Sequence, residues 1–256
     1  MNNKHSNTPL VSIITVVKNR KNTILRALES VKNQTYPNIE HIIIDGKSTD
    51  GTIEIIKAFK GRFKLIIERD QGIYDALNKG IKYANGTLIG IMNSDDLYYD
   101  MNTISEAVKT FIIDNCDGVY GDVYYFRTKT PDKFVRIIRS VDYGFKYIDM
   151  GLMPAHTSFF FKKSVFEKYG YYDISYKIAG DFEFIARITK DNNINLIYSK
   201  FIKIKMQIGG ISTSGMVNFI IKNLEIIKAC QKNNIKTNWF NLGLRFFFKI
   251  YEYIKK

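Results

Sequence analysis

Short apolar runs alternate with longer stretches of helical periodicity through the front part of the chain. The runs are continuously hydrophobic and rich in β-branched residues, as is usual for strands buried on both faces of a parallel sheet. Strands are therefore predicted at residues 10–17, 39–45, 63–68 and 87–93, and helices at about 23–33, 52–59 and 72–83. This repeated strand–helix–strand order predicts an α/β fold with a mainly parallel sheet.

The rear part of the chain has a less regular pattern. Aromatic-rich extended runs at residues 118–126, 134–140 and 157–161 indicate a mixed extension of the sheet. Helices are predicted at about 103–112 and 181–189, followed by two short extended runs and by amphipathic helices at about 215–231 and 239–253. No repeat, low-complexity segment or linker marks a separable domain. We therefore expect one α/β domain over residues 1–210 and a helical tail over residues 211–256.

Composition narrows the class of protein. The chain has 256 residues, of which 45% are hydrophobic and 25% charged, which suits a globular domain with a substantial core. The only cysteines are Cys116 and Cys230, without metal-type spacing, and no secretory leader or apolar run of membrane-spanning length is seen. These features predict a protein of a reducing, cytosolic compartment.

The net charge of +13 indicates an anionic partner, and most of that charge lies near the carboxyl end. Residues 200–256 hold eleven Lys or Arg against Glu225 and Glu252, so they carry 11 − 2 = +9 of the total. The front half is nearly neutral by comparison.

Polar side chains follow each of the four predicted front strands. Asn19, Asp45 and Asp70 follow the first three, and residues 93–96, Asn-Ser-Asp-Asp, follow the fourth. In a parallel sheet the carboxyl ends of the strands meet at one edge, which is where ligands bind. Loops are polar in any protein, but four coincidences at one edge favour a binding site.

The string Asn93-Ser94-Asp95-Asp96 is the strongest local signal. Adjacent carboxylates repel each other unless a cation lies near them, and a hard divalent ion shared with phosphate oxygens is a common solution. The string therefore indicates a metal–diphosphate site. The alternative is a carboxylate pair that caps the next helix or lies in a solvated turn.

A second string, residues 42–52, has a buried strand that ends in Asp45, then a turn and a helix start at Thr52. Asp45 can accept a hydrogen bond from a base imide or a ribose, whereas Asp50 or Ser48 can cap the helix. A haloacid-dehalogenase-type phosphatase would need two aspartates two positions apart, and here they are five apart. The glycine-rich loops of nucleoside triphosphate and dinucleotide sites are also missing.

Further candidates lie on two predicted helices and before a strand. Asp75, Asn78 and Lys79 share one face of a helix whose amino end can bind an anion, although a solvated polar face would look the same. Asp181 lies at the start of an apolar helix. It is either a helix-start residue favoured by the helix dipole or a general base. His156 precedes a predicted strand. It is either a contact for a metal or phosphate or an ordinary polar residue.

These strings together resemble the family 2 glycosyltransferases of the GT-A fold, a Rossmann-like mixed sheet flanked by helices. In particular, they resemble the bacterial polysaccharide and lipopolysaccharide enzymes related to the colanic-acid type. The resemblance covers residues 11–100 and 154–188, through Ser12–Asn19, residues 45–52, residues 70–80 and the Asp-x-Asp equivalent at 93–96. It implies that residues 8–100 bind a nucleotide sugar and that residues 101–210 bind the acceptor.

The resemblance also implies roles for individual residues. Asp96 would hold Mg²⁺ or Mn²⁺, with His156 as a further candidate ligand, and Asp181 would be the catalytic base, although the usual acidic pair is Gly180-Asp181 here. The residues implied to bind the nucleotide sugar are Thr15, Val17, Asn19, Asp45, Asp75, Asn78, Lys79, Ser94 and Asp95. The Gln-x-x-Arg-Trp string of processive members is missing, so one sugar is expected to move per encounter.

The implied reaction is an inverting transfer from a nucleoside-diphosphate sugar, expected to be a UDP-sugar, to a hydroxyl of a glycan or lipid-linked acceptor in bacterial surface polysaccharide synthesis. A catalytically silent sugar-nucleotide-binding or scaffold protein of the same fold is the alternative. A nucleotidyltransferase with a similar sheet is a second alternative. Such an enzyme would normally have a glycine-rich, basic triphosphate loop after the first strand, whereas residues 17–21 here are basic but contain no glycine.

The tail interleaves aromatic and basic residues from Trp239 to Lys256. Such a helix suits the interface of an anionic membrane, where it would meet a lipid-diphosphate acceptor. The alternative is a helix that packs on the domain and exposes its basic face to solvent. Nucleic acid is a less favoured partner, because the sequence has no recognised nucleic-acid-binding module. We expect a cytoplasmic protein, peripheral on the inner face of the cytoplasmic membrane.

Overall fold

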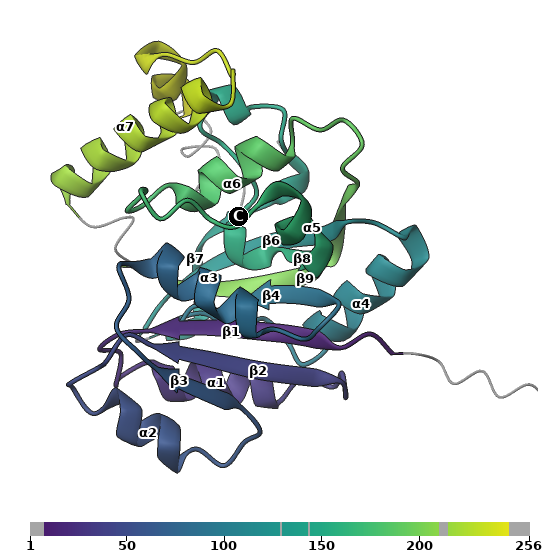
Figure 1. The fold of residues 1–256 in the computed structure, drawn as a ribbon, viewed down its shortest axis with the longest axis vertical. Helices are drawn as coiled ribbons and strands as arrows, with labels where there is room; N and C mark the ends of the chain where they lie inside the picture. The colour runs from purple at the N-terminus through teal and green to yellow at the C-terminus, as the bar shows by residue number, and fades with distance from the viewer. Residues whose placement is uncertain (1–7, 129, 143, 210–214, 246–256) are drawn as a thin grey trace, which may run out of the picture.

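The computed structural model describes residues 8–128, 130–142, 144–209 and 215–245. Its centre is a nine-stranded sheet with the order β3-β2-β1-β4-β8-β6-β9-β5, and β7 pairs with β6 outside this path (Figure 1). The front strands are parallel and confirm the α/β prediction. They are β1 (Val11–Val17), β2 (Ile39–Asp45), β3 (Lys64–Ile67) and β4 (Leu88–Ile91).

Three helices connect the front strands and cover both faces of the sheet. α1 (Ile24–Lys32) buries Ile24, Ala27, Leu28 and Val31, the spacing expected of one helix face. With α2 (Thr52–Ala58) it covers the face that carries Val17 and Ile43. α3 (Ile73–Tyr83) covers the other face, where its apolar side chains pack against Ile14 and Ile42.

The rear strands make the sheet mixed, as predicted. β8 (Phe160–Lys162) is antiparallel to β4, and β6 (Gly118–Arg127) is antiparallel to β8. β9 (Leu196–Gln207) runs parallel to β6 and pairs at its end with β5 (Leu97–Tyr98), while β7 (Thr130–Ile138) forms a hairpin with β6. The sheet therefore runs without a break from the front half into the rear half.

Some rear elements differ from the prediction. The expected strand at 157–161 begins at Phe160, because residues His156–Ser158 form a 3-10 turn, η3. The two short extended runs are one long strand, β9. A short helix that was not predicted, α5 (Lys163–Tyr169), follows β8 directly. Two further 3-10 turns, η1 (Ser140–Asp142) and η2 (Ile148–Met150), lie between β7 and η3.

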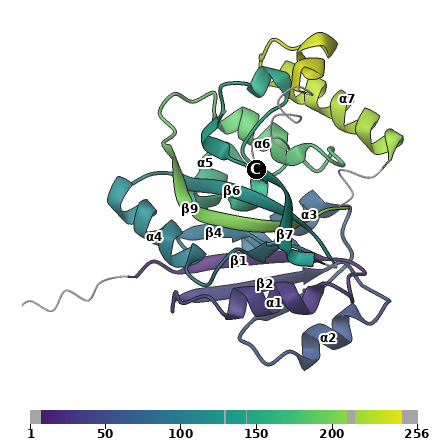
Figure 2. The ribbon, with the colours of Figure 1, turned by 180° about the vertical axis from the view of Figure 1, so that it is seen from behind.

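The remaining helices complete the two layers. α4 (Thr103–Asp114) packs against β9 and β6 on the same face as α1, which is visible from behind in Figure 2. α6 (Gly180–Ile188) and α7 (Met216–Lys232) pack together on the α3 face, at the end of the molecule opposite α2 (Figure 1). Residues 239–245 are helical, and the rest of the predicted last helix lies outside the described residues.

α7 belongs to the main core although the sequence places it in the tail. Ile226, Ala229 and Cys230 are buried in the cluster that contains Phe182 and Ile185 of α6. Cys230 and Cys116 are both buried free thiols. Within the described ranges, no helix is long and apolar enough to cross a membrane.

Candidate active site

The parallel strands bring the predicted front-half residues to one edge of the sheet. Val17, at the end of β1, pairs with Asp45, at the end of β2, and Asp45 pairs with Ile67, near the end of β3. β4 lies on the other side of β1, so residues 93–96 leave the sheet at the same edge. This edge is also where the strand order reverses, between β1 and β4, which is where α/β folds usually bind their ligands.

Asp45 presents an unused acceptor at this edge. Its side chain is fully buried, and its Oδ1 accepts a hydrogen bond from the backbone N–H of Ser48 at 2.7 Å. Its other oxygen, Oδ2, is buried, and nothing among the described residues donates to it. A buried carboxylate oxygen normally has a donor, so Oδ2 fits an N–H or O–H group of a ligand.

Asn19 joins the loop after β1 to the loop after β2. Its backbone N–H donates to Ser48 Oγ at 2.8 Å, and its Oδ1 accepts from the N–H of Thr49 at 2.9 Å. Asn19 has a positive φ of 53°, a conformation that asparagine tolerates better than most residues. The side chain therefore shapes the wall of the edge around Asp45.

The prediction that Asp50 supports the start of α2 agrees with the structure. Its Oδ1 accepts from the N–H of Thr52, the first helical residue, at 3.1 Å. Its Oδ2 accepts from the N–H of Lys21 at 3.1 Å. Asp50 therefore has a local structural role beside the site.

Asp95 and Asp96 form a carboxylate pair that is short of positive charge. Asp96 is only 1% exposed, and burial together with the Asp95 charge holds its pKa well above the usual range. Burial also raises the pKa of Asp95, although Arg20 and Arg26 oppose that shift. Both carboxyl groups would gain from a cation close by.

The contacts of Asp96 fix its position. Asn93 Nδ2 donates to Oδ2 at 2.9 Å, and the N–H of Gln207, at the end of β9, donates to Oδ1 at 3.3 Å. Ser94, which is also buried, lies in the same turn. The donor set suits a hard divalent ion, although in the described part of the chain no three His, Cys, Asp or Glu side chains form a ready-made metal site. The diphosphate and water would supply the remaining oxygens.

The side chains of Thr15 and Val17 are buried, although Val17 ends its strand at the sheet edge. Thr15 is fully buried within β1, and its hydroxyl pairs with His41 Nε2 at 2.9 Å. Val17 is buried in the core on the α1 face, while its carbonyl accepts from the N–H of Gly46 at 2.9 Å. Neither side chain reaches the surface, so they support the site from beneath.

The face of α3 that the sequence singles out divides into two environments. Asp75 and Lys79 form an ion pair at 3.1 Å, and Lys79 also reaches Glu68 at 3.2 Å. Burial would raise the pKa of Asp75, but hydrogen bonds from the N–H of Gln71 and from Lys79 lower it. The pair holds the start of α3 against the loop that follows β3.

Asn78 has a structural role that differs from the predicted nucleotide contact. Its Nδ2 donates to the carbonyl of Tyr172 at 2.8 Å, and its Oδ1 accepts from the N–H of Tyr172 at 3.0 Å. Both ends of the amide are thus paired with one backbone residue of the rear half. Asn78 fastens α3 to the segment before α6.

Asp181 lies at the start of α6, next to α3. Its Oδ1 accepts from the hydroxyl of Tyr74 at 3.2 Å and from the N–H of Phe182 at 2.9 Å. Tyr74 is the second residue of α3, which begins after the carboxyl end of β3, so Asp181 lies on the side of the sheet edge that carries the other candidates. Among the described residues nothing donates a hydrogen bond to its second oxygen, Oδ2, which leaves that atom available as a proton acceptor.

His156 lies in the neighbourhood of Asp181 rather than that of Asp96. Its Nε2 lies 2.6 Å from the hydroxyl of Tyr172, and burial lowers its pKa while the Asp181 charge opposes the shift. The structure does not group His156 with Asp95 and Asp96 in a shared ligand set. Its role as a metal ligand therefore stays a prediction that this geometry does not favour.

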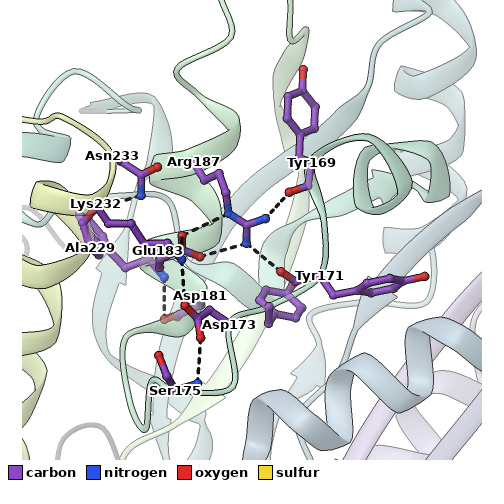
Figure 3. Close-up of polar contacts among 12 residues, drawn as sticks. Tyr169, Tyr171, Asp173, Ser175, Asp181, Glu183, Arg187, Ala229, Lys232 and Asn233 are labelled. Carbon is purple, nitrogen blue, oxygen red and sulfur yellow. Dashed lines mark hydrogen bonds and ion pairs between the residues drawn. The ribbon is translucent and has the colours of Figure 1, made fainter.

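A buried ion network supports α6 at Glu183, two residues after Asp181 (Figure 3). Glu183 is fully buried, and its carboxylate contacts Arg187 at 3.0 Å and Lys232 of α7 at 3.1 Å. Lys232 also contacts Asp173 at 2.8 Å. The network links α6, α7 and the segment before α6 into one unit.

Several residues of the site were not singled out from the sequence. Arg20 and Arg26 place positive charge near Asp95, and Gln207 fixes Asp96 from a strand more than a hundred residues away. Tyr74 fixes Asp181. Only the arginines had a signal in sequence, since they closely follow the first strand, whereas the other two contacts depend on tertiary packing.

Residues 12–170 match the family profile described as Glycosyl transferase family 2. The chain belongs to this family. It is therefore a glycosyltransferase, and its mixed sheet flanked by helices is the GT-A fold.

Curated relatives agree with this membership. The PGL/p-HBAD biosynthesis glycosyltransferase of Mycobacterium bovis (strain BCG / Pasteur 1173P2) is 32% identical over 191 residues, which cover 70% of this chain and 69% of the relative. The putative glycosyltransferase EpsH of Bacillus subtilis (strain 168) is 40% identical over 92 residues, 35% of this chain and 27% of the relative.

Solved structures share the fold at low identity. The mannosyltransferase PcManGT from Pyrobaculum calidifontis in complex with GDP-Man and Mn²⁺ has a TM-score of 0.61 at 19% identity, covering 86% of this chain and 62% of that one. S. aureus TarS 1–349 in complex with UDP has a TM-score of 0.65 at 16% identity, covering 88% of this chain and 65% of that one. The chain thus spans somewhat less than two thirds of these neighbours.

Proposed function

We propose that the enzyme is a metal-dependent, inverting glycosyltransferase that moves one sugar from a nucleoside-diphosphate sugar, a UDP-sugar, to an acceptor hydroxyl. The observation that carries the proposal is the carboxylate pair of Asp95 and buried Asp96 at the strand-order reversal, beside the unused Oδ2 of Asp45. A nucleoside diphosphate has an N–H donor that would suit Asp45 and phosphate oxygens of the kind that a hard divalent ion prefers. The neighbours with Mn²⁺ and UDP support this donor class.

In this proposal Asp45 and Asn19 select the nucleoside, while Asp95 and Ser94 contact the ribose or diphosphate. Asp96 would hold Mg²⁺ or Mn²⁺, and such an ion would neutralise the negative charge that develops on the leaving diphosphate. Arg20 and Arg26 add positive charge to the same region.

Asp181 is proposed as the general base. Its Oδ2, to which no described residue donates, takes the proton of the acceptor hydroxyl as the acceptor oxygen bonds to the anomeric carbon, and the bond from that carbon to the diphosphate breaks. Attack from the face opposite the leaving group inverts the anomeric centre. The hydroxyl of Tyr74 holds the other carboxylate oxygen and thereby orients the base.

The acceptor is proposed to be a glycan or lipid-linked saccharide of bacterial surface polysaccharide synthesis, met at the inner face of the cytoplasmic membrane. Large apolar side chains are exposed on the first turns of α7 and on the segment after it: Met216, Val217, Phe219, Ile220, Leu224, Trp239 and Phe240. We call this set the α7 apolar surface. It lies in the most basic part of the chain, a combination that suits an anionic bilayer interface.

The donor site is tested by isothermal titration with UDP, GDP, CMP and dTDP, each with and without Mn²⁺. We expect one nucleotide to bind in a metal-dependent manner, and the binding to be lost in Asp96→Ala. Asp114→Ala, which removes an exposed carboxylate from the end of α4, is the matched control and is expected to bind normally. Failure of all four nucleotides to bind would favour the silent-scaffold alternative.

The membrane surface is tested separately. Trp239 is the single tryptophan of the chain and is 57% exposed, so its fluorescence reports directly on the α7 apolar surface. We expect a blue shift with vesicles of anionic phospholipid and a much smaller one with phosphatidylcholine alone. Equal spectra with and without anionic vesicles would contradict membrane docking and leave the donor site unaffected.

A further inference from the structure

A carboxylate from α7 holds the loop that leads into α6. Glu225 Oε1 accepts from the backbone N–H of Lys177 at 2.7 Å, and Oε2 accepts from the N–H groups of Ile178 at 2.9 Å and Ala179 at 2.8 Å. Three consecutive backbone donors therefore converge on one charged side chain. Hydrogen bonds to an ionised acceptor are about twice as strong as neutral ones, so this contact fixes the loop firmly.

The same loop is connected to Asp181 through Tyr74. The single O–H of Tyr74 is shared between two acceptors, the carbonyl of Ile178 at 2.7 Å and Asp181 Oδ1 at 3.2 Å. Gly180 allows this arrangement, because a Cβ at that position would lie 2.8 Å from a ring carbon of Tyr74. A continuous chain of contacts therefore runs from Glu225 to the proposed base.

We propose that Glu225 is a positioning residue for Asp181, which goes beyond the proposed function and rests on its assignment of the base. α6 has no side-chain cap at its N-cap residue, Ala179, and Glu225 accepts the hydrogen bond from the backbone N–H of that residue. The negative charge of Glu225 also favours the amino end of α6 through the helix dipole. Loss of the contact leaves Asp181 present and chemically intact but poorly placed.

Glu40 provides a matched control far from the site. Its carboxylate accepts from the N–H groups of Asn85 at 2.5 Å and Gly86 at 3.0 Å and from the Asn85 side chain at 3.1 Å, before β4. It lies near the start of β2, at the edge of the sheet opposite the candidate site. Glu40→Gln removes a similar set of charge-assisted bonds without touching the loop before α6.

Amide hydrogen exchange tests the contact itself. Glutamine keeps one acceptor but turns an amide group toward a backbone N–H, so Glu225→Gln is expected to raise exchange at residues 177–179, on the order of 10-fold, since a net bond of about 1.5 kcal/mol is lost. Exchange at residues 85 and 86 should not change. Glu40→Gln should show the reverse, and unchanged exchange at 177–179 in Glu225→Gln would overturn the proposal.

Kinetics test the consequence for the base, with the donor and acceptor found for the wild type. We expect kcat to fall on the order of 10- to 100-fold in Glu225→Ala, and less in Glu225→Gln, since small misplacements of a reacting group have effects of this size. Nucleotide affinity should stay at the wild-type value, which also shows that the variants fold. Glu40→Gln should keep the wild-type kcat.

The Asp181→Asn background separates positioning from general destabilisation. If Glu225 acts through the base, Glu225→Ala should lower turnover little further once Asp181 is replaced. An equal loss in both backgrounds, or a wild-type kcat in Glu225→Ala, overturns the role of Glu225 while the proposed function stands. Full turnover by Asp181→Asn would overturn the base assignment itself and the role of Glu225 with it.

Discussion

Replacing Glu183 with glutamine tests the buried ion network behind the site (Figure 3). The substitution keeps the shape of the side chain but removes its charge and turns one acceptor into a donor. In the wild type, Glu183 accepts from Arg187 at 3.2 and 3.0 Å and contacts Lys232 at 3.1 Å, with no exposure to solvent. Glu183→Gln therefore leaves two cations short of an acceptor.

The size of the effect follows from what the two cations retain. Breaking a buried ion pair by removing one partner costs about 3–5 kcal/mol. In the variant, Arg187 keeps its hydrogen bond to the carbonyl of Tyr171 at 2.7 Å, and Lys232, which is 46% exposed, keeps its ion pair with Asp173. We therefore expect a loss of stability at the lower end of this range, about 3 kcal/mol. In a protein of this size that lowers Tm by roughly 6–12 °C.

Thermal unfolding followed by circular dichroism at neutral pH measures the shift. Lys168→Met removes the ion pair of Lys168 with Asp191 at the surface and is expected to leave Tm unchanged. A wild-type Tm for Glu183→Gln would refute the reasoning, because it would mean that the network does not contribute to stability. Nucleotide binding should survive the substitution, since the network lies behind α6 and away from Asp45.

Three further predictions concern the pH dependence, the base and the nucleoside. Burial lowers the pKa of His41 to about 4, below the ~6.5 of a free imidazole, so its contribution to stability is complete above about pH 6.5 and is lost as the pH falls toward 4. Tm should therefore fall more steeply over that range in the wild type than in His41→Gln, and equal slopes in a pH series of melts would count against this cause. Gly180→Ala places a methyl group 2.8 Å from the ring of buried Tyr74, so kcat should drop although alanine favours helices; a wild-type kcat with unchanged donor affinity would show that the ring can move aside. Asp45→Asn keeps an acceptor for the Ser48 N–H but replaces the free oxygen by a donor, and titration should show nucleotide affinity weaker on the order of 10-fold or more, whereas unchanged affinity would remove Asp45 from the nucleoside site.

The front half of the fold was predictable because its signals are local. Continuous apolar runs and helical spacing are properties of neighbouring residues, and Asp45 and Asp96 could be placed at the sheet edge because each follows such a run. The strand β9 was predicted as two runs because Lys200, Lys203 and Lys205 interrupt its apolar pattern. α5 begins at Lys163, directly after β8 ends at Lys162, so no turn residue in the sequence separates the helix from the strand.

The contacts around Asp181 could not be predicted, because their partners are distant in the sequence. Glu225 holds a loop that lies 46 to 48 positions before it, and Asn78 pairs with Tyr172, 94 positions away. From the sequence alone, Glu225 and Asn78 each look like a polar residue on the surface of a helix. Only the packing of α7 on α6, and of α3 on the rear half, gives them these partners.

The continuous sheet has a consequence for chimeras made between this chain and its relatives. β5 belongs to the front half in sequence, yet its sheet partner is β9, and Asp96 is fastened by Gln207 at the end of that strand. A chimera joined near residue 100, with its rear half from a relative, would place the relative's β9 next to the carboxylate pair of this chain. Changing side chains and loops within the rear half is therefore expected to disturb the carboxylate pair less than exchanging that half whole.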